Sequence, residues 1–335
     1  MNILVANNYF DKMGGSETFC FTLIEELKRA GHKVEYFTFY KGIISEKIET
    51  ELGVNFMSES KYDLILANHD TCVRYLAHKG KIIQTCHGVF PPLEQPSRFA
   101  DGYVSISEEV AAHLLSKGFK SKVILNGINC DRFSVKKPIN TQLKKVLSLC
   151  QSDVANNSLK KACDILGISM IQLNKHINPQ WQVEQAINEV DLVVGLGRSA
   201  YEGMACGRPV LVFDDRGYFE SYSDGYLNKN NIDYSIINNC SGRFYKKKLD
   251  LNELVIELQK YNPQDGLFLR EYALKNLNIK NQVEKYLEYA DSLKPSKFYL
   301  LLHLLMWAYF LKNNFKRKKK EVKKAIKLYF SGNRH

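Results

Sequence analysis

The chain has 335 residues, of which 45% are hydrophobic and 25% charged, the balance of a soluble globular protein with room for two compact domains. Its formal net charge is +11, but ten Lys or Arg and one Glu fall within residues 312–335, so the rest of the chain is nearly neutral. The charge therefore does not indicate that the main body of the protein binds nucleic acid.

Cysteine usage and the amino terminus indicate the compartment. The eight cysteines include no CxxC pair, and Cys20, Cys150 and Cys163 lie within apolar segments, which favours reduced and mostly buried thiols. Residues 2–6 form a strand-like apolar run with no basic region before it and no cleavage pattern after it, so no secretory signal is expected. We expect a cytoplasmic protein.

Strand patterns alternate with helical patterns through the first part of the chain. A helix after Ser16 places its apolar residues on one face and ends at Gly31, and Ser107 caps a second helix that ends at Gly118. The expected strands are residues 2–6, 34–39, 63–67, 81–85, 103–106 and 122–125. This alternation predicts an α/β domain with a doubly wound parallel sheet over residues 1–133.

A second domain follows a short linker. The polar stretch 134–144 contains Pro138 and predicts a connection without regular structure. A new alternating series opens at residues 146–150, which predicts a second Rossmann-like domain over residues 145–265. Residues 266–293 are expected to be helical.

A glycine loop between two apolar strands predicts half of a ligand site. Residues 190–194, apart from Asp191, and residues 210–213 are apolar without alternation, as in parallel strands that are covered on both faces. Between them, Gly195 and Gly197 permit a sharp turn, and Ser199 is expected to cap a short helix. The first amide groups of such a helix have no internal partner and attract phosphate.

Two charged side chains belong to this turn. Arg198 can neutralise phosphate charge. Glu202 is expected in the first helical turn, where it would repel a diphosphate, so its better use is to accept hydrogen bonds from sugar hydroxyls. The alternative is an ordinary βαβ turn in which Glu202 only caps the helix and Arg198 is solvated.

The residues that follow, EGMACGRPV at 202–210, resemble the donor-site signature of retaining glycosyltransferases of family 4. Other segments match further landmarks of that family, in the family's order. They are residues 14–17 with 27–34, 85–88, 104–110 and 125–133. Such ordered matches, spread over about residues 1 to 290, are much harder to obtain by chance than one glycine motif.

This resemblance implies the GT-B architecture, in which two Rossmann-like domains face each other across a cleft and terminal helices, here residues 266–293, cross back to the first domain. The donor, a nucleotide sugar, would bind mainly the second domain, with its ribose at Glu202. Its diphosphate would face the turn at 195–199, where Arg198 is the best candidate to stabilise the departing group. No metal cofactor is expected.

The first domain supplies further candidates. His87 follows an expected strand, at the sheet end where histidines of the family approach the transferred sugar. A neutral imidazole there can bond a sugar hydroxyl or the attacking oxygen, and the alternative is a satisfied core histidine. Gly14 and Gly15 would let their loop approach the donor phosphates or the acceptor, although a plain helix entry also explains them.

The chain departs from the family at two places. Val194 stands where family members commonly carry a second glutamate. Asp214, Asp215 or Glu220 could replace that carboxylate from the loop after the next strand, and we include Glu220 among the donor-binding candidates. The two aspartates could also bind a metal ion that holds the diphosphate, as in single-domain glycosyltransferases. The prediction of two paired domains argues against this role. The usual arginine and lysine pair has no clear counterpart, because the nearby Lys160 could simply be exposed.

The tail, residues 294–335, combines an apolar and a basic segment. Residues 298–311 are apolar apart from His303 and as a helix would reach about 21 Å, short of the ~30 Å hydrocarbon core of a bilayer. We expect this segment to lie in the headgroup region with Trp307 at the interface. The basic residues that would bind anionic lipid include Lys316, Arg317, Lys318, Lys319 and Lys320. A packed helix with a solvated end and RNA binding are the alternatives.

Together these observations predict a hexosyltransferase-like glycosyltransferase that is cytoplasmic and peripheral on the inner face of the membrane. It would move a sugar from a nucleotide-diphosphate donor to a hydroxyl of a glycan or lipid-linked acceptor, with retention as the resemblance implies, in the synthesis of cell-surface polysaccharide or glycolipid. Two alternatives stay open. One is a sugar-nucleotide or glycan-binding protein of the same fold without catalysis, motivated by Val194, and the other is a polyanion-binding scaffold built on the tail.

Overall fold

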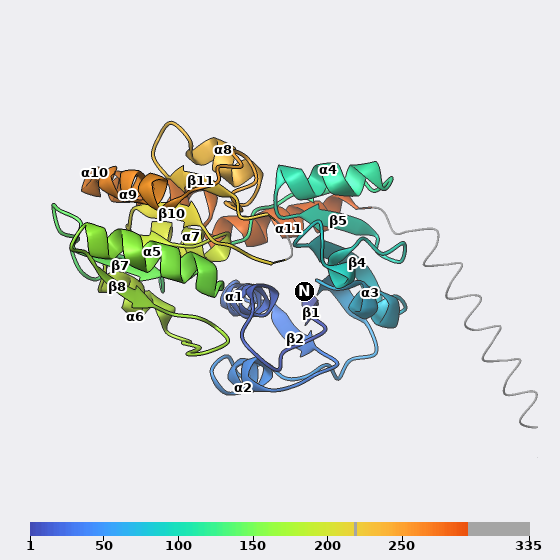
Figure 1. Cartoon of the computed structure of the whole chain (residues 1–335). Helices are drawn as coiled ribbons and strands as arrows, with labels where there is room; N and C mark the ends of the chain where they lie inside the picture. The colour runs from blue at the N-terminus through green and yellow to red at the C-terminus, as the bar shows by residue number, and fades with distance from the viewer. Residues whose placement is uncertain (218–219, 294–335) are drawn as a thin grey trace, which may run out of the picture.

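The computed structural model describes residues 1–217 and 220–293, which form two α/β domains that follow each other along the chain (Figure 1). The fold class predicted from the sequence is confirmed. The membrane-binding predictions for Trp307 and residues 316–320 fall outside the described residues. Among the described helices, none has both the length and the apolar composition that crossing a bilayer requires.

The first domain is built on a six-stranded sheet with the order β2-β1-β3-β4-β5-β6, and all of its pairings are parallel. The strands are β1 (Asn2–Ala6), β2 (Lys33–Phe37), β3 (Tyr62–Ala67), β4 (Gly80–Cys86), β5 (Gly102–Ser105) and β6 (Lys122–Val123). The order reverses at β1, which lies between β2 and β3. Doubly wound sheets bind ligands outside the carboxyl ends of their strands at such a point.

The helices of the first domain cover this sheet. They are α1 (Gly15–Arg29), α2 (Ile43–Thr50), α3 (Asp70–Leu76), α4 (Glu108–Ser116) and the short 3₁₀ turn η1 (Pro92–Glu94). The apolar face of α1 buries Phe19, Leu23 and Leu27 in the same core as the strand residues Ile3 and Val5. The amphipathic pattern in the sequence therefore set which face of α1 meets the sheet.

The second domain contains a five-stranded sheet with the order β11-β10-β9-β7-β8. Its strands are β7 (Lys145–Ser148), β8 (Ser169–Gln172), β9 (Leu192–Val194), β10 (Val210–Phe213) and β11 (Ser223–Tyr226). Only the edge strand β11 runs antiparallel to its neighbour, a feature that the sequence did not predict. The order reverses at β7, so this sheet also has a point where loops diverge and a ligand can bind.

The helices of the second domain are α5 (Asp153–Ile165), α6 (Val183–Asn188), α7 (Arg198–Ala205), α8 (Ile232–Ile237) and α9 (Leu251–Gln259). The prediction for α7 was wrong by two residues. Gly197, not Ser199, occupies the cap position, and Glu202 is the fifth helical residue, not part of the first turn. The shift follows from the left-handed backbone of Gly197, at φ 57°, which starts the helix earlier than a serine cap would.

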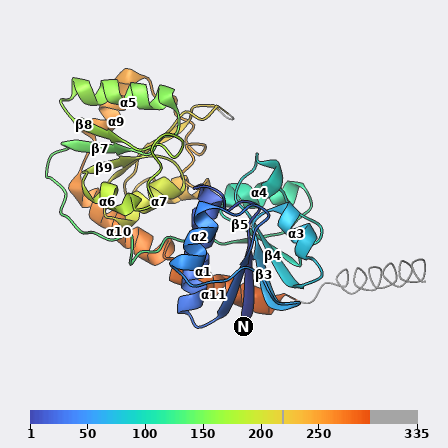
Figure 2. The ribbon, with the colours of Figure 1, turned by 90° about the horizontal axis from the view of Figure 1, so that it is seen from below.

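Two terminal helices complete the fold, α10 (Pro263–Asn276) and α11 (Ile279–Ser292). Figure 2 shows α10 along the second domain and α11 beneath the first. The helix α11 places Ile279, Val283 and Tyr286 in the core of the first domain, and the Tyr286 hydroxyl lies 2.9 Å from Oγ1 of Thr85 on β4. The last described helix therefore belongs to the first domain although it follows the second in sequence.

All eight cysteines lie in the described part of the chain, and each is a buried, free thiol. Burial raises the pKa of these groups, for example to about 12 for Cys72 and Cys86. The prediction of buried cysteines from their apolar surroundings is confirmed.

Candidate active site

A cavity of about 520 Å³ lies between the two domains, and we call it the interdomain cavity. Its walls come from loops at the carboxyl ends of both sheets, including residues that follow β1 and β4 in the first domain and β7, β8, β9 and β10 in the second. This is where paired doubly wound domains are expected to hold a ligand, and the volume is that of a small-molecule site.

Most of the predicted site residues line this cavity. They are Gly14, Gly15, His87, Gly197, Arg198, Ser199 and Glu202. Gly195 supports the turn instead, because a Cβ atom there would lie 2.9 Å from Cβ of Ser199. The structure does not bring Glu220 to the other donor-binding candidates: its carboxylate forms a 2.8 Å ion pair with Lys248, and 60% of its side chain is exposed.

The start of α7 faces the cavity. Gly197 and Ser199 both line it, and the cap of the helix makes no side-chain hydrogen bond. The amide groups of Gly197 and Ser199 already donate to the carbonyls of Cys240 and Leu196, at 2.9 and 3.2 Å. The first amide groups of an α-helix have no partner within the helix, so the others at this start can donate hydrogen bonds to an anion in the cavity.

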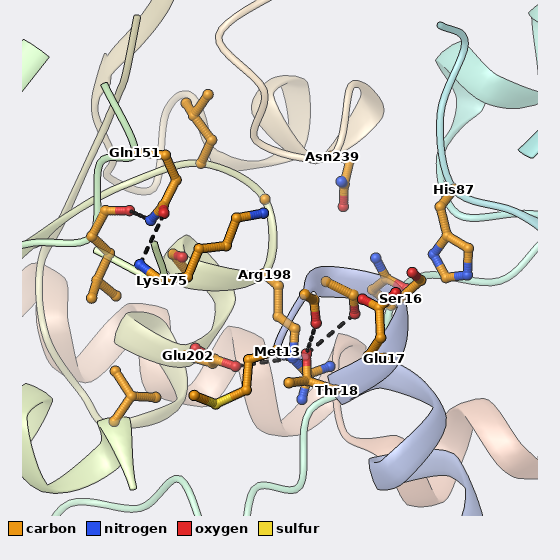
Figure 3. Close-up of a pocket in the computed structure, with 18 of the residues that line it drawn as sticks. Met13, Ser16, Glu17, Thr18, His87, Gln151, Lys175, Arg198, Glu202 and Asn239 are labelled. Carbon is orange, nitrogen blue, oxygen red and sulfur yellow. Dashed lines mark hydrogen bonds and ion pairs between the residues drawn. The ribbon is translucent and has the colours of Figure 1, made fainter. Parts of the chain in front are cut away.

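Arg198 and Glu202 form a nearly buried ion pair, with Nε donating to Oε1 at 2.9 Å and about a tenth of each side chain exposed, 11% and 12% (Figure 3). The other guanidinium nitrogens cross to the first domain, where they donate to the carbonyl of Gly127 and to Oγ1 of Thr22, each at 3.0 Å. Burial raises the pKa of Glu202 and lowers that of Arg198, and each partner opposes the shift of the other. The alternative of a solvated Arg198 is therefore wrong.

Because Arg198 is bonded in this way and Nε of Arg216 donates to Oδ2 of Asp214 at 2.9 Å, Lys175 is the cation on the second-domain wall that is best placed for an anion. Lys175 follows β8 and Arg216 follows β10, and both line the cavity although sequence reasoning missed them. The ammonium of Lys175 makes no hydrogen bond or ion pair with another residue of the described part of the chain. Burial and the charge of Arg216 lower the pKa of Lys175, while Glu17 opposes them. An anion in the cavity would relieve this unfavourable charge.

His87 lies on the opposite wall, from the first domain (Figure 3). Its Nε2 is 2.7 Å from Oδ1 of Asn68, whose amide nitrogen donates to the carbonyl of Ala6 at 3.0 Å and contacts Sγ of Cys20. That arrangement fixes Oδ1 as the atom facing His87, so Nε2 carries the proton and Nδ1 is an acceptor. Burial lowers the pKa of His87 to about 3, with His69 and Arg198 adding to the effect, and the ring is neutral at physiological pH.

Besides the carboxylate oxygen Oε2 of Glu94, three polar atoms around the cavity are buried without a hydrogen-bond partner in the described structure. They are Oδ1 of Asn126, Oδ1 of Asn239 and Oγ of Ser241. Asn239 also has a left-handed backbone, with φ 56°, next to Gly197. A buried polar group without a partner costs about 1–3 kcal/mol, so these three atoms are positions that a polar ligand or ordered water would stabilise.

The other candidates lie elsewhere. Val194 is buried on β9. Asp214 is fully buried and accepts hydrogen bonds from the backbone of Gln151 and Ser152, which fixes the loop after β7. Lys160 is exposed on α5, where it pairs with Asp164. Among the described residues, no three His, Cys, Asp or Glu side chains are grouped as ligands for a metal ion.

Two Rossmann-like domains that face each other across such a cavity define the GT-B fold. The structure of a point mutant of Staphylococcus aureus TarM in complex with fondaparinux, alpha-GlcNAc-glycerol and UDP is similar, with 11% identity, a TM-score of 0.55, and coverage of 87% of this chain and 100% of that chain. A second TarM structure gives 12% identity, a TM-score of 0.52 and coverage of 87% and 99%.

A protein from Listeria monocytogenes assigned as a UDP-N-acetylglucosamine 2-epimerase is also similar, with 10% identity, a TM-score of 0.52 and coverage of 88% and 98%. At these identities the likeness establishes the fold, and the fold alone carries more than one chemistry. The sequence matches no protein-family model and no curated protein.

Proposed function

We propose that the protein is a glycosyltransferase that moves a sugar from a nucleoside-diphosphate sugar to a hydroxyl of a glycan or lipid-linked acceptor. The observation that carries this proposal is the difference in chemistry between the two walls of the interdomain cavity. Its second-domain wall combines an uncapped helix start with the cations of Lys175 and Arg216, and its first-domain wall presents the neutral His87. The TarM structure, which contains UDP, shows the same fold around a nucleoside diphosphate.

Each part of the wall has a role in this reaction. The amide groups at the start of α7 and the ammonium of Lys175 would hold the diphosphate and stabilise the negative charge that develops as it leaves. Glu202 would accept hydrogen bonds from the ribose hydroxyls, with Arg198 holding the carboxylate in place. The free Nδ1 of His87 would accept a hydrogen bond from a hydroxyl of the transferred sugar or of the acceptor.

Retention of anomeric configuration is part of the proposal and rests on the resemblance of residues 202–210 to the family signature. We also propose that the reaction needs no metal cofactor, since the cations and helix amides on this wall would neutralise the diphosphate themselves. The same resemblance supports a place in the synthesis of cell-surface polysaccharide or glycolipid. Val194 favours one other function, the binding of a sugar nucleotide without turnover.

A screen of nucleoside-diphosphate sugars by thermal shift tests the donor proposal. A donor present at 100 times its Kd stabilises the folded protein by about 2.7 kcal/mol, so the cognate sugar nucleotide is expected to raise Tm in a concentration-dependent way. Release of nucleoside diphosphate that requires an acceptor would then separate a transferase from a binding protein. The absence of any stabilising sugar nucleotide would overturn the proposal, and stabilisation without turnover would favour the binding protein.

We further propose that residues 294–335 hold the protein on the inner face of the membrane. The full chain is expected to sediment with vesicles containing phosphatidylserine and to be released by raised salt. Changing Lys316, Arg317, Lys318, Lys319 and Lys320 to Gln should reduce sedimentation at least tenfold, because each basic residue near the surface contributes about 1 kcal/mol. Equal sedimentation of this variant, or of a chain without residues 296–335, would refute membrane docking.

A further inference from the structure

The two walls of the interdomain cavity carry opposite charge. Among the described lining residues, those that precede Arg132 include the carboxylates of Glu17 and Glu94 but no Lys or Arg. The wall from the second domain carries Lys175, Arg198, Arg216 and Arg243, with Glu202 as its one carboxylate among the described lining residues. Arg132, at the end of the first domain, also lines the cavity, but its guanidinium pairs with Glu184 of the second domain at 3.0 Å. A diphosphate is attracted to the second wall and repelled by the first, so the first wall must serve another part of the substrates.

Glu94 is placed in this wall by close packing of the backbone. It ends η1, and its Oε2 is buried without a hydrogen-bond partner in the described structure. A Cβ atom at Gly88 would lie 2.8 Å from this oxygen, so the absence of a side chain at Gly88 is what lets the carboxylate lie beside the residue that follows His87. The carboxylate thus lies against the same loop as the neutral imidazole.

Glu17 lies near Glu94 in the cavity. Burial and, to a smaller extent, the charge of Glu17 raise the pKa of Glu94 to about 7, and burial also raises the pKa of Glu17 itself. Glu17 already accepts a hydrogen bond from Nδ2 of Asn7 at 3.4 Å, whereas Oε2 of Glu94 has no partner in the described structure. Two buried carboxylates in one wall are unfavourable unless further groups donate hydrogen bonds to them. His87 adds a third acceptor, its Nδ1, so the cluster presents acceptors to whatever binds there.

We propose that Glu17, Glu94 and His87 form the acceptor subsite, and that the acceptor places there an uncharged or amino sugar, not a phosphorylated or carboxylated one. Hydroxyl and ammonium groups donate hydrogen bonds and satisfy the buried oxygens, whereas a phosphate or carboxylate brings only acceptors and further negative charge. This inference rests on the proposed function and adds the chemical class of the acceptor.

Binding of matched sugar probes to the full chain, measured by saturation-transfer NMR with nucleoside diphosphate present, tests this subsite. The probes are octyl glycosides of the gluco, galacto and manno series, each in neutral, amino, 6-carboxylate and 6-phosphate form. Neutral or amino members of at least one series are expected to bind, and the anionic members of that series at least tenfold more weakly. Equal or stronger binding of anionic members, or no binding by any probe, would overturn the inference.

Variants of the two glutamates test whether the sugar probes bind at Glu17, Glu94 and His87. Glu94→Gln and Glu17→Gln keep the size of the side chain and are each expected to weaken binding of the neutral probe at least tenfold, with less than a twofold change in nucleoside diphosphate affinity. Glu108→Gln, at an exposed position of α4, is the matched control and should change neither affinity. Unchanged probe binding in both cluster variants would refute the subsite.

Failure of this inference and failure of the proposed function give different results. If no nucleoside diphosphate or sugar nucleotide binds, the donor proposal fails first. If the nucleotide binds normally but the affinity for the sugar probes does not depend on the charge of Glu17 and Glu94, only the proposal of the acceptor subsite is wrong. Glu94→Lys gives a second readout, because in a folded variant the preference should shift at least tenfold toward the anionic probes.

Discussion

Replacing Arg198 with Met is expected to lower kcat/KM for the cognate sugar nucleotide by about 100-fold or more, because Glu202, which is proposed to bind the ribose, loses the group that orients it. The variant should also lose about 3–5 kcal/mol of folding stability, the cost of removing one partner of a buried ion pair. The guanidinium holds Glu202 and also bonds Thr22 and the carbonyl of Gly127 across the cleft. Its loss would leave a buried carboxylate unpaired and would release the two walls from each other. Steady-state kinetics and urea unfolding measure both effects.

A double variant separates stability from donor binding. Arg198→Met with Glu202→Met removes both charges, so the folded state should regain most of the stability that the single variant loses. Turnover should stay low, because Glu202 is proposed to hold the ribose. Lys160→Met is the control, since Lys160 and Asp164 have the same spacing on α5 but are exposed at 53% and 58%, and such pairs contribute about 0–1 kcal/mol. Full turnover by the double variant would contradict the role given to Glu202.

Replacing Arg208 with Met is expected to lower the free energy of unfolding by at least about 3 kcal/mol, because each buried polar group left without its partner costs about 1–3 kcal/mol. Only 1% of Arg208 is exposed. Its guanidinium donates to the carbonyls of Ile187, Lys137, Cys206 and Asn188, at 2.9 to 3.3 Å. These bonds tie the linker and α6 to the turn after α7.

Urea unfolding checks this expectation, with Arg74→Met as the control. Arg74 is 65% exposed and pairs with Asp70 on the surface of α3, so its loss should change stability by less than about 1 kcal/mol. Although Arg208 belongs to the segment that resembles the donor signature, it does not line the cavity. Folded Arg208→Met protein should therefore bind the nucleotide with nearly normal affinity. A variant that unfolds at the same urea concentration as the original protein would show that these bonds add nothing.

The sequence predicted the fold well because its signals are local. Apolar runs and helix caps gave nearly every strand of the two sheets and the positions of α1 and α4. The strands β8 and β11 were not predicted. In β11, with the sequence SDGY, three of the four residues have low strand propensity, so the strand depends on pairing with β10.

The site was predicted only in part, for a different reason. The turn at 195–199 and its neighbours have a recognisable local pattern. The ion pair between Arg198 and Glu202 was not predicted, although a spacing of four residues on one helix favours such a pair. Lys175 and Glu94 follow other strands and meet the site only through the fold. Their one sequence signal was a charged residue in the loop after a strand, which many surface residues share. Glu220 is the opposite case: it lies close in sequence to the donor-site segment, but the fold places it in an exposed ion pair with Lys248.

The position of α11 has a consequence for synthesis of the protein. Ile279, Val283 and Tyr286 fill the core of a domain whose sheet ends at Val123. During translation, that core stays incomplete until the helix has left the ribosome, after the whole second domain has been made. A nascent chain that stalls between the two domains therefore exposes apolar surface, which is what chaperones bind and proteases remove.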